Sequence, residues 1–195
     1  MPKIKDKILK IHTPSPCYPV IKEIASRWSP RFFSDEDIPQ KDLNSIFEAA
    51  RFAPSAHNQQ PWHFYFTHKK SRSYTKLFST LSDYNKSWAK TAPVLILACA
   101  IEENKKGENI FAFYDLGAAV ISLILQAQSL GYYSRQMALF DKEEVKKLFP
   151  ITKNCAPYII IAMGKIGNFD KAPQEIINYE LDPRPRKTAF AEELK

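Results

Sequence analysis

"ENIFAFYDLGAAVISLILQAQSLGY", residues 108–132, predicts one long helix that is apolar on nearly every face. One stripe at helical spacing consists of Leu116, Val120, Leu123, Ala127 and Leu130. The other faces are apolar too, for example at Ile121 and Leu125. A helix of this kind is buried in a large core or in a subunit interface, and a chain of 195 residues is small for such a core. We therefore expect a homodimer with this helix at its interface.

Three segments outside this helix predict β-strands. "WHFYFT" (62–67) is aromatic and β-prone, and "PVLILACAI" (93–101) and "PYIIIAMG" (157–164) are short continuous apolar runs. The last two are expected to be central strands that are buried on both faces. An amphipathic helix is predicted for "QKDLNSIFEAARF" (40–52). Because helices and strands mix without a regular βαβ rhythm, the predicted fold class is α+β.

Length and composition are those of a globular protein with one main domain. The chain has 195 residues, of which 45% are hydrophobic and 25% charged. We expect an N-terminal arm over residues 1–20, with at most one helical turn, and a single domain over residues 21–195. The longest apolar run is too short to span a bilayer, which takes about 20 residues, and residues 1–12 contain no apolar signal core. A cytoplasmic protein without a membrane partner is predicted.

Two basic segments are candidates for binding an anion. In "SRWSPRFFSD" (26–35), Arg27, Ser29 and Arg31 alternate, so an extended backbone would point all three side chains to one side. In "DPRPRKTAF" (182–190), Arg184 and Arg186 lie close together with no acid between them. The planar fork of arginine suits phosphate, and a serine hydroxyl can complete such a site. The alternative is an exposed loop whose arginines pair with the acids of residues 35–37.

Common cofactor and metal motifs are absent from the sequence. The chain has only five glycines and no GxGxxG or P-loop pattern, so a phosphate would have to be held by arginine side chains. The three cysteines show no CxxC spacing, and the histidines have no partners at metal-ligand spacing. Neither a disulfide framework nor a metal site is therefore predicted.

A polar loop is predicted in "AARFAPSAHNQQPWHFYF" (49–66), between the end of a helix and a strand. It contains Ser55, Asn58 and Gln60, whose hydroxyl and carboxamide groups can read the donor and acceptor edge of a heteroaromatic ring. Serine and asparagine are also ordinary turn residues, so a purely structural loop is the alternative.

Taken in order, these segments resemble the FMN-dependent nitroreductase family. "SRWSPRFF" followed by "AARFAPSAHNQQPWHF" is similar to the arginine-x-serine stretch and the polar loop of that family. The resemblance continues through "YDLGAAVISLILQAQSLGY", "SRQMALFD", "PYIIIAMGK" and "PRPRKTAFAEE", so it covers about residues 20–195. It implies an α+β fold with a central mixed β-sheet flanked by helices. It also implies a homodimer with FMN sites at the subunit interface.

The resemblance implies a role for each basic residue. Arg27 and Ser29 would bind the FMN phosphate and ribityl chain, together with Arg184 and Arg186 from the C-terminal segment. Arg31 would reach the pyrimidine end of the isoalloxazine ring, where a cation stabilises the anionic reduced flavin.

The remaining implied contacts are polar or backbone contacts to the flavin ring. Ser55, Asn58 and Gln60 would approach it across the dimer interface, and Asn85 would make a further polar contact. The resemblance implies that "SRQMALFD" is a loop that faces the flavin, in which residues 136–138 stand where the family more commonly has a tryptophan and glycines near flavin N5. The full implied cofactor-binding set is Arg27, Trp28, Ser29, Arg31, Ser55, Asn58, Gln60, Asn85, Gln136, Met137, Ala138, Arg184 and Arg186.

The resemblance also implies an activity. NAD(P)H would pass a hydride to flavin N5, and a nitroaromatic, a quinone or a related electron-poor small molecule would then take the electrons in a ping-pong sequence. The flavin would carry this chemistry, so no catalytic side chain is expected. Two alternatives are a flavin-binding protein without NAD(P)H turnover and a family branch that acts on one specific metabolite. A basic nucleic-acid binder is least favoured, because no binding motif appears, and no nucleic-acid partner is predicted.

Overall fold

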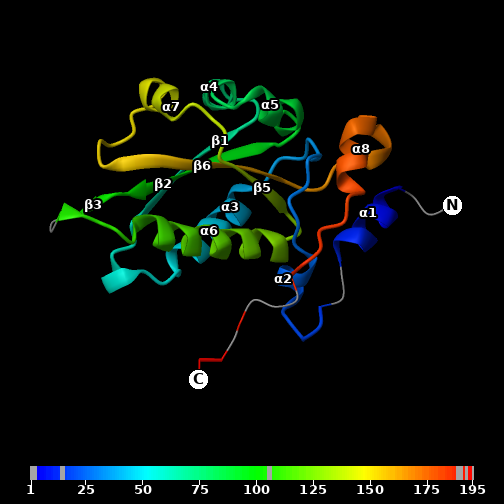
Figure 1. Ribbon diagram of the computed structural model, residues 1–195. Coiled ribbons are helices and arrows are strands. Elements are labelled where there is room, and N and C mark those ends of the chain that lie inside the picture. Colours follow the sequence, from blue (N-terminus) through cyan, green and yellow to red (C-terminus); the bar gives the residue numbers. More distant parts are fainter. Residues whose placement is uncertain (1–3, 14–15, 105–106, 188–190, 192, 195) are drawn as a thin grey trace.

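A four-stranded antiparallel sheet forms the centre of the computed structural model, which describes residues 4–13, 16–104, 107–187, 191 and 193–194 (Figure 1). The strand order is β1 (Trp62–His68), β2 (Val94–Ile101), β6 (Cys155–Gly164) and β5 (Tyr133–Met137). The three strands predicted from the sequence are all present, and the two long apolar runs are the central ones. The α+β class is thus confirmed.

The family resemblance implied a mixed sheet, but the observed sheet is antiparallel. Every pairing among its described strands is antiparallel. The reason lies in the long connection through helix α6 (Ala112–Ser129). This connection joins β2 to β5, which run in the same direction, but β6 lies between them and pairs antiparallel with both. The two parallel strands therefore never become neighbours.

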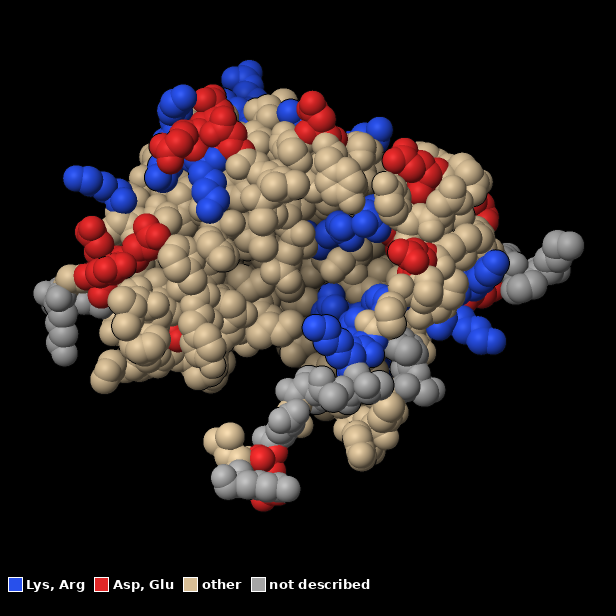
Figure 2. Space-filling view, viewed as in Figure 1, with Lys and Arg blue, Asp and Glu red and all other residues tan. Residues whose placement is uncertain are grey.

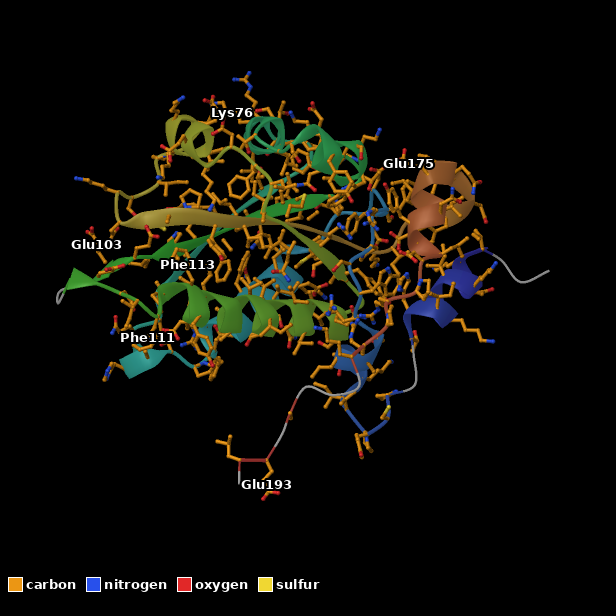
Figure 3. The ribbon with its side chains drawn as sticks, in the orientation of Figure 1. Lys76, Glu103, Phe111, Phe113, Glu175 and Glu193 are labelled. Atoms are coloured by element: carbon orange, nitrogen blue, oxygen red, sulfur yellow. The ribbon has the colours of Figure 1, made fainter. Side chains whose placement is uncertain are left out.

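Helices cover both faces of the sheet (Figure 1). One face carries α3 (Gln40–Arg51) and α6, and the other carries α4 (Arg72–Ser79), α5 (Asp83–Ala89) and α7 (Lys142–Leu148). Alternate residues of β2 join the two cores: Val94, Ile96, Ala98 and Ala100 pack with α3 and α6, and Leu95, Leu97 and Cys99 pack on the other side. Figure 3 shows side chains filling both layers. Burial on both faces explains why β2 reads as a continuous apolar run.

Helix α6 covers one face of the sheet but leaves its own outer side bare. Leu116 and Leu123 are buried against the sheet, whereas Tyr114 and Ile121 are 81% and 44% exposed. The helix is thus apolar on a side that the described residues leave exposed. The predicted dimer interface remains a prediction, and the exposed side of α6 is where it would lie.

The N-terminal segment is more ordered than the sequence indicated. Residues Ile4–His12 form the nine-residue helix α1, so the prediction of at most one helical turn is wrong. Its anchor is Ile8, which is fully buried and packs with Trp28 and Phe169 in a third apolar cluster. The lysines between the isoleucines concealed this amphipathic spacing. The division into an arm and a single domain stays a prediction.

Short elements complete the chain. They are α2 (Lys22–Ser26), the 3-10 turns η1 (Ala56–Asn58) and η2 (Phe169–Lys171), the hairpin β3 (Glu103–Asn104) and β4 (Gly107–Glu108), and α8 (Gln174–Glu180). Strand β5 corrects the prediction that "SRQMALFD" is a loop, because residues 133–137 pair with β6. Across the described residues, no helix has both the length and the apolar character needed to cross a bilayer.

Candidate functional site

The two basic segments meet in one pocket of about 310 Å³, which we call the basic pocket. Its lining consists of five arginines with seven other residues: Arg27, Arg31, Arg135, Arg184, Arg186, His12, Trp28, Ser29, Tyr179, Glu180, Asp182 and Pro183. Figure 2 shows the basic side chains gathered around a hollow beside α8 and the C-terminal segment. Sequence reasoning placed Arg27, Trp28, Ser29, Arg31, Arg184 and Arg186 in one site, and the structure brings these six together.

A buried acid, Glu180, accepts hydrogen bonds from the segment of residues 27–31. Glu180, at the end of α8, is 1% exposed. One of its carboxylate oxygens accepts a hydrogen bond from the backbone nitrogen of Arg31 at 2.8 Å, and the other accepts one from Trp28 Nε1 at 3.0 Å. Trp28 thus lines the pocket, but its indole N–H donates to the buried Glu180. The Arg27 and Arg31 side chains keep their own donors for other partners.

A fifth arginine fixes the middle of the same segment. Arg135 Nη1 donates a 2.6 Å hydrogen bond to the carbonyl oxygen of Ser29, and its guanidinium lies 5.0 Å from the ring centre of Trp88. Arg135 lies in strand β5, and the strand places its side chain beside the backbone of residues 27–31. Sequence reasoning missed Arg135, although it lies within the quoted "SRQMALFD" segment.

Positive charge predominates in the basic pocket, which is lined by five arginines and only two acids, Glu180 and Asp182. Within the described part of the chain, none of the five guanidinium groups forms a salt bridge with a carboxylate. Burial, followed by the charge of Arg186, lowers the pKa of Arg27. Burial, followed by the charge of Arg31, lowers that of Arg135. These groups stay charged at neutral pH, so the pocket suits an anion, and the predicted alternative of pairing with residues 35–37 is not observed.

Arg184 connects two helix ends and retains unmatched donors. Its Nη2 donates to the carbonyl oxygens of His12 at 3.0 Å and Ala25 at 3.2 Å, at the C-terminal ends of α1 and α2. Its buried Nε and Nη1 have no partner among the described residues. Burial and the charges of Arg186 and Arg27 lower its pKa to about 10. A half-buried cation with two buried, unmatched donors fits a site that holds an anion such as a phosphate.

The predicted polar loop is compact and strained. Gln60 donates from its backbone nitrogen to Ser55 Oγ at 2.9 Å and from its amide to Asn58 Oδ1 at 3.2 Å. His57, Asn58 and Gln60 all have positive φ, between 49° and 53°. Such left-handed backbone in residues other than glycine costs roughly 1–3 kcal/mol each and is concentrated at functional sites. The predicted residues Ser55, Asn58 and Gln60 therefore share one exposed loop.

This loop and the basic pocket lie at opposite ends of α6. Ala56 donates from its backbone nitrogen to Asp115 in the first turn of the helix at 3.1 Å, whereas Gln128 in the last turn reaches Ser26, the neighbour of Arg27, at 3.4 Å. Thirteen residues of helix rise about 20 Å. The loop and the pocket of one chain thus do not form one site, although each could contribute to a site shared between two chains.

The other four predicted site residues do not line the basic pocket. Asn85 is buried and donates its amide to the carbonyl oxygen of Leu139 at 3.0 Å, which fixes the loop after β5. Met137 is buried in the core beneath α4, α5 and α7. Gln136 and Ala138 are exposed. Their predicted contacts with a flavin ring remain predictions.

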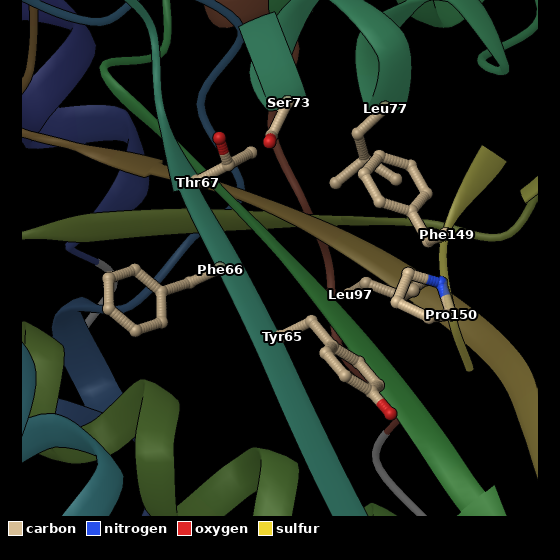
Figure 4. A pocket seen from close by; sticks show the side chains of 8 residues that line it. All are labelled: Tyr65, Phe66, Thr67, Ser73, Leu77, Leu97, Phe149 and Pro150. Carbon is tan, nitrogen blue, oxygen red and sulfur yellow. The ribbon is translucent and has the colours of Figure 1, made fainter. Parts of the chain in front are cut away.

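A second cavity, of about 160 Å³, lies on the other face of the sheet between β1, α4 and the segment after α7 (Figure 4). Its lining is mostly apolar, with Leu77, Leu97, Phe149 and Pro150 grouped around it. It contains none of the predicted site residues and no charged side chain. The basic pocket is therefore the stronger candidate for a functional site.

Comparisons with known proteins give a consistent set of matches. A family model described as the nitroreductase family matches residues 24–79 and 68–165. A relative from Archaeoglobus fulgidus, provisionally named as an NADH dehydrogenase/NAD(P)H nitroreductase, is 30% identical over 148 residues, or 74% of this chain and 83% of the relative. The FMN reductase (NAD(P)H) of Bacillus subtilis is 26% identical over 184 residues, or 83% of this chain and 73% of that protein.

A solved structure is also similar over nearly the whole chain. It is described as an oxidoreductase containing FMN, and it matches with a TM-score of 0.84 at 30% identity. The match covers 94% of this chain and 97% of the other. Helices α1 and α8, which help to line the basic pocket, lie outside the range of the family model.

Proposed function

Because this chain belongs to the nitroreductase family, we propose that it is an FMN-dependent oxidoreductase that uses NAD(P)H to reduce nitroaromatics, quinones or related electron-poor acceptors. The observation that carries the proposal is the convergence in one pocket of five arginines that form no salt bridge with a carboxylate of the described residues. Bound FMN would supply the hydride chemistry, and the protein would supply orientation and electrostatics. The ping-pong order of the two half-reactions is part of the proposal.

The phosphate of FMN would be held at the basic pocket by Arg27, Ser29 and Arg186. Arg27 Nη1 lies 3.4 Å from Ser29 Oγ, so a guanidinium and a hydroxyl are already adjacent. Arg184 would support the phosphate from the buried side with its unmatched donors. Arg31 would contact the pyrimidine end of the ring, because its backbone is fixed by Glu180 while its side chain remains at the pocket.

A homodimer would complete each site. One side of α6 exposes apolar side chains to water. Packing against the same surface of a second copy of the chain would bury them. If the two α6 helices pack antiparallel, the loop at the start of one helix approaches the basic pocket at the end of the other. Ser55, Asn58 and Gln60 would then contact the flavin held by the partner. A cytoplasmic location is kept as a prediction that accords with the three free thiols.

The test is the visible absorption spectrum of the purified protein loaded with FMN, before and after anaerobic addition of NADPH or NADH. Bleaching of the flavin band, and its return on adding a quinone, is the expected result. A flavin band that persists with both donors would favour the alternative of a flavin-binding protein without NAD(P)H turnover. Failure to retain FMN at all would contradict the proposal.

A further inference from the structure

Tyr84, on α5, is a side chain without an assigned role that contacts Arg31 of the basic pocket. It is 49% exposed, so the residue can be approached from solvent and by a small molecule. The hydroxyl oxygen accepts a hydrogen bond from Arg31 Nη2 at 3.5 Å, and Arg135 acts on the same group. Two guanidinium groups from different parts of the chain thus converge on one phenol.

The direction of these hydrogen bonds leaves the phenol proton uncommitted. A guanidinium can only donate, so the Tyr84 oxygen must be the acceptor towards Arg31. Within the described residues, no acceptor for the Tyr84 O–H is found. The proton is therefore available to a molecule that binds next to the hydroxyl, while the arginines stay on the oxygen.

Charges around Tyr84 favour its phenolate form. The hydrogen bond from Arg31 and the charges of Arg31 and Arg135 lower the pKa of Tyr84, and burial opposes them with a smaller effect. On α5 itself, Asp83 and Lys86 form an ion pair with each other at 3.6 Å. From α8, Tyr179 lies under the Arg31 guanidinium at 4.4 Å, and Glu180 acts on Arg135. The hydroxyl itself thus faces positive charge.

We propose that Tyr84 is the catalytic proton donor for the acceptor half-reaction, an inference that rests on the proposed function. For a quinone acceptor, the hydride that originates from NAD(P)H adds to one carbonyl oxygen with its electron pair. The Tyr84 O–H bond breaks, its proton goes to the other oxygen, and its electron pair stays on the phenolate. Arg31 and Arg135 stabilise that phenolate, and water returns the proton to the half-exposed side chain. The products are the hydroquinone, NAD(P)⁺ and the restored phenol.

This inference revises the expectation that no side chain takes part in the chemistry. Bound FMN would still supply the electrons, but the reduction of a quinone by hydride also consumes one proton. A positioned acid contributes typically 10²–10⁴-fold to such a step. Tyr84 is a phenol stabilised in its anionic form by two fixed cations, which is the property required of that acid.

The first test needs no flavin. The near-ultraviolet phenolate band of the apoprotein is titrated for the wild type, Tyr84→Phe, and Tyr18→Phe, which removes an exposed tyrosine that, unlike Tyr84, is not hydrogen-bonded by Arg31. Among nine tyrosines, we expect one phenol to ionise below the ordinary value of about 10, in the wild type and Tyr18→Phe but not in Tyr84→Phe. If a phenol that ionises early is still present in Tyr84→Phe, the proposal is overturned.

The second test compares two acceptors on the FMN-loaded protein. Reduction of a benzoquinone consumes a proton, whereas reduction of ferricyanide does not. In Tyr84→Phe, the quinone rate should fall by roughly 10²–10⁴-fold relative to the ferricyanide rate. An unchanged ratio of the two rates would overturn the role of Tyr84. Dithionite can replace NAD(P)H as the reductant, so a failure of the NAD(P)H assignment is distinguished from a failure of this inference.

Discussion

Glu180 and Arg31 are joined by a 2.8 Å hydrogen bond from the Arg31 backbone nitrogen to a carboxylate that is almost fully buried. The contact links residues 149 positions apart in the sequence. It fixes the main chain of Arg31 and leaves the side chain to contact Tyr84 and Tyr179. A buried acid thus orients the backbone of a basic site without forming a described salt bridge to any of its five arginines.

Replacing Glu180 by glutamine should destabilise the protein and weaken FMN binding. Glutamine has one acceptor oxygen, so either Trp28 Nε1 or Arg31 N loses its partner. An unmatched buried donor costs about 1–3 kcal/mol. Urea unfolding with and without saturating FMN measures both effects. Glu175→Gln, an exposed change on the same helix (Figure 3), is the matched control, and equal behaviour of the two variants would contradict the role of Glu180.

The double variant Arg27→Ala/Arg186→Ala should remain folded and lose FMN. Each charge-assisted hydrogen bond to a phosphate is worth about 1.5–3 kcal/mol, so the dissociation constant should rise at least 100-fold. Flavin fluorescence during equilibrium dialysis gives the constant. Lys76→Ala, an exposed basic residue on α4 (Figure 3), should leave it unchanged. Full retention of FMN by the double variant would remove the phosphate assignment.

Asn58→Gly separates the side chain of the loop from its backbone conformation. The φ of Asn58 is 53°, which glycine adopts without strain, so folding stability should hold while the carboxamide is lost. FMN affinity should fall about tenfold, which corresponds to one hydrogen bond of roughly 1.4 kcal/mol. If dialysis shows unchanged affinity, the loop is structural.

Acid should loosen the docking of α1 through His12. Its Nε2 donates to the carbonyl oxygen of Glu180 at 2.8 Å, and its buried Nδ1 has no partner in the described structure. Desolvation lowers the pKa of His12, so the unfolded chain takes up the proton first. The contribution of His12 is then complete above pH ~6.5 and lost as pH falls, by at most about 1.4 kcal/mol per pH unit.

Thermal unfolding from pH 7.5 to 5, compared between the wild type and His12→Gln, checks this sign. Glutamine keeps an amide donor for the Glu180 carbonyl but does not titrate. The wild type should therefore lose more stability than the variant over this range. A parallel decline of both proteins would assign the acid sensitivity to other groups.

Ile121→Glu should convert a dimer into a monomer. The side chain is 44% exposed on the bare side of α6, and burying an unpaired carboxylate there would be strongly unfavourable. Sedimentation velocity gives the oligomeric state, and FMN retention should fall together with dimerisation. Lys76→Glu also introduces a carboxylate, on the exposed surface of α4, and should remain dimeric. A wild-type protein that is monomeric would contradict the expected interface.

The sequence predicts most of the sheet, because buried strands and a helix apolar on nearly every face leave strong local patterns. Strand β5 was not predicted because its sequence "YSRQM" is short and polar. It lies at the sheet edge, where packing against one neighbouring strand decides its conformation. Glu180 and Arg135 could not be found, since their partners lie 149 and 106 residues away and no local pattern marks them. Arginine clusters are visible in a sequence, whereas the groups that orient them are not.

The separation of the polar loop and the basic pocket along α6 determines how two variants with weakened FMN binding would behave when they are combined in one dimer. In a dimer with shared sites, a hybrid of one Arg27→Ala chain and one Asn58→Gly chain has two unequal sites. One site receives both defective halves, whereas the other receives an intact pocket and an intact loop. Co-expression of the two variants should therefore restore one flavin per hybrid dimer, a form of complementation that a site contained within one chain does not permit.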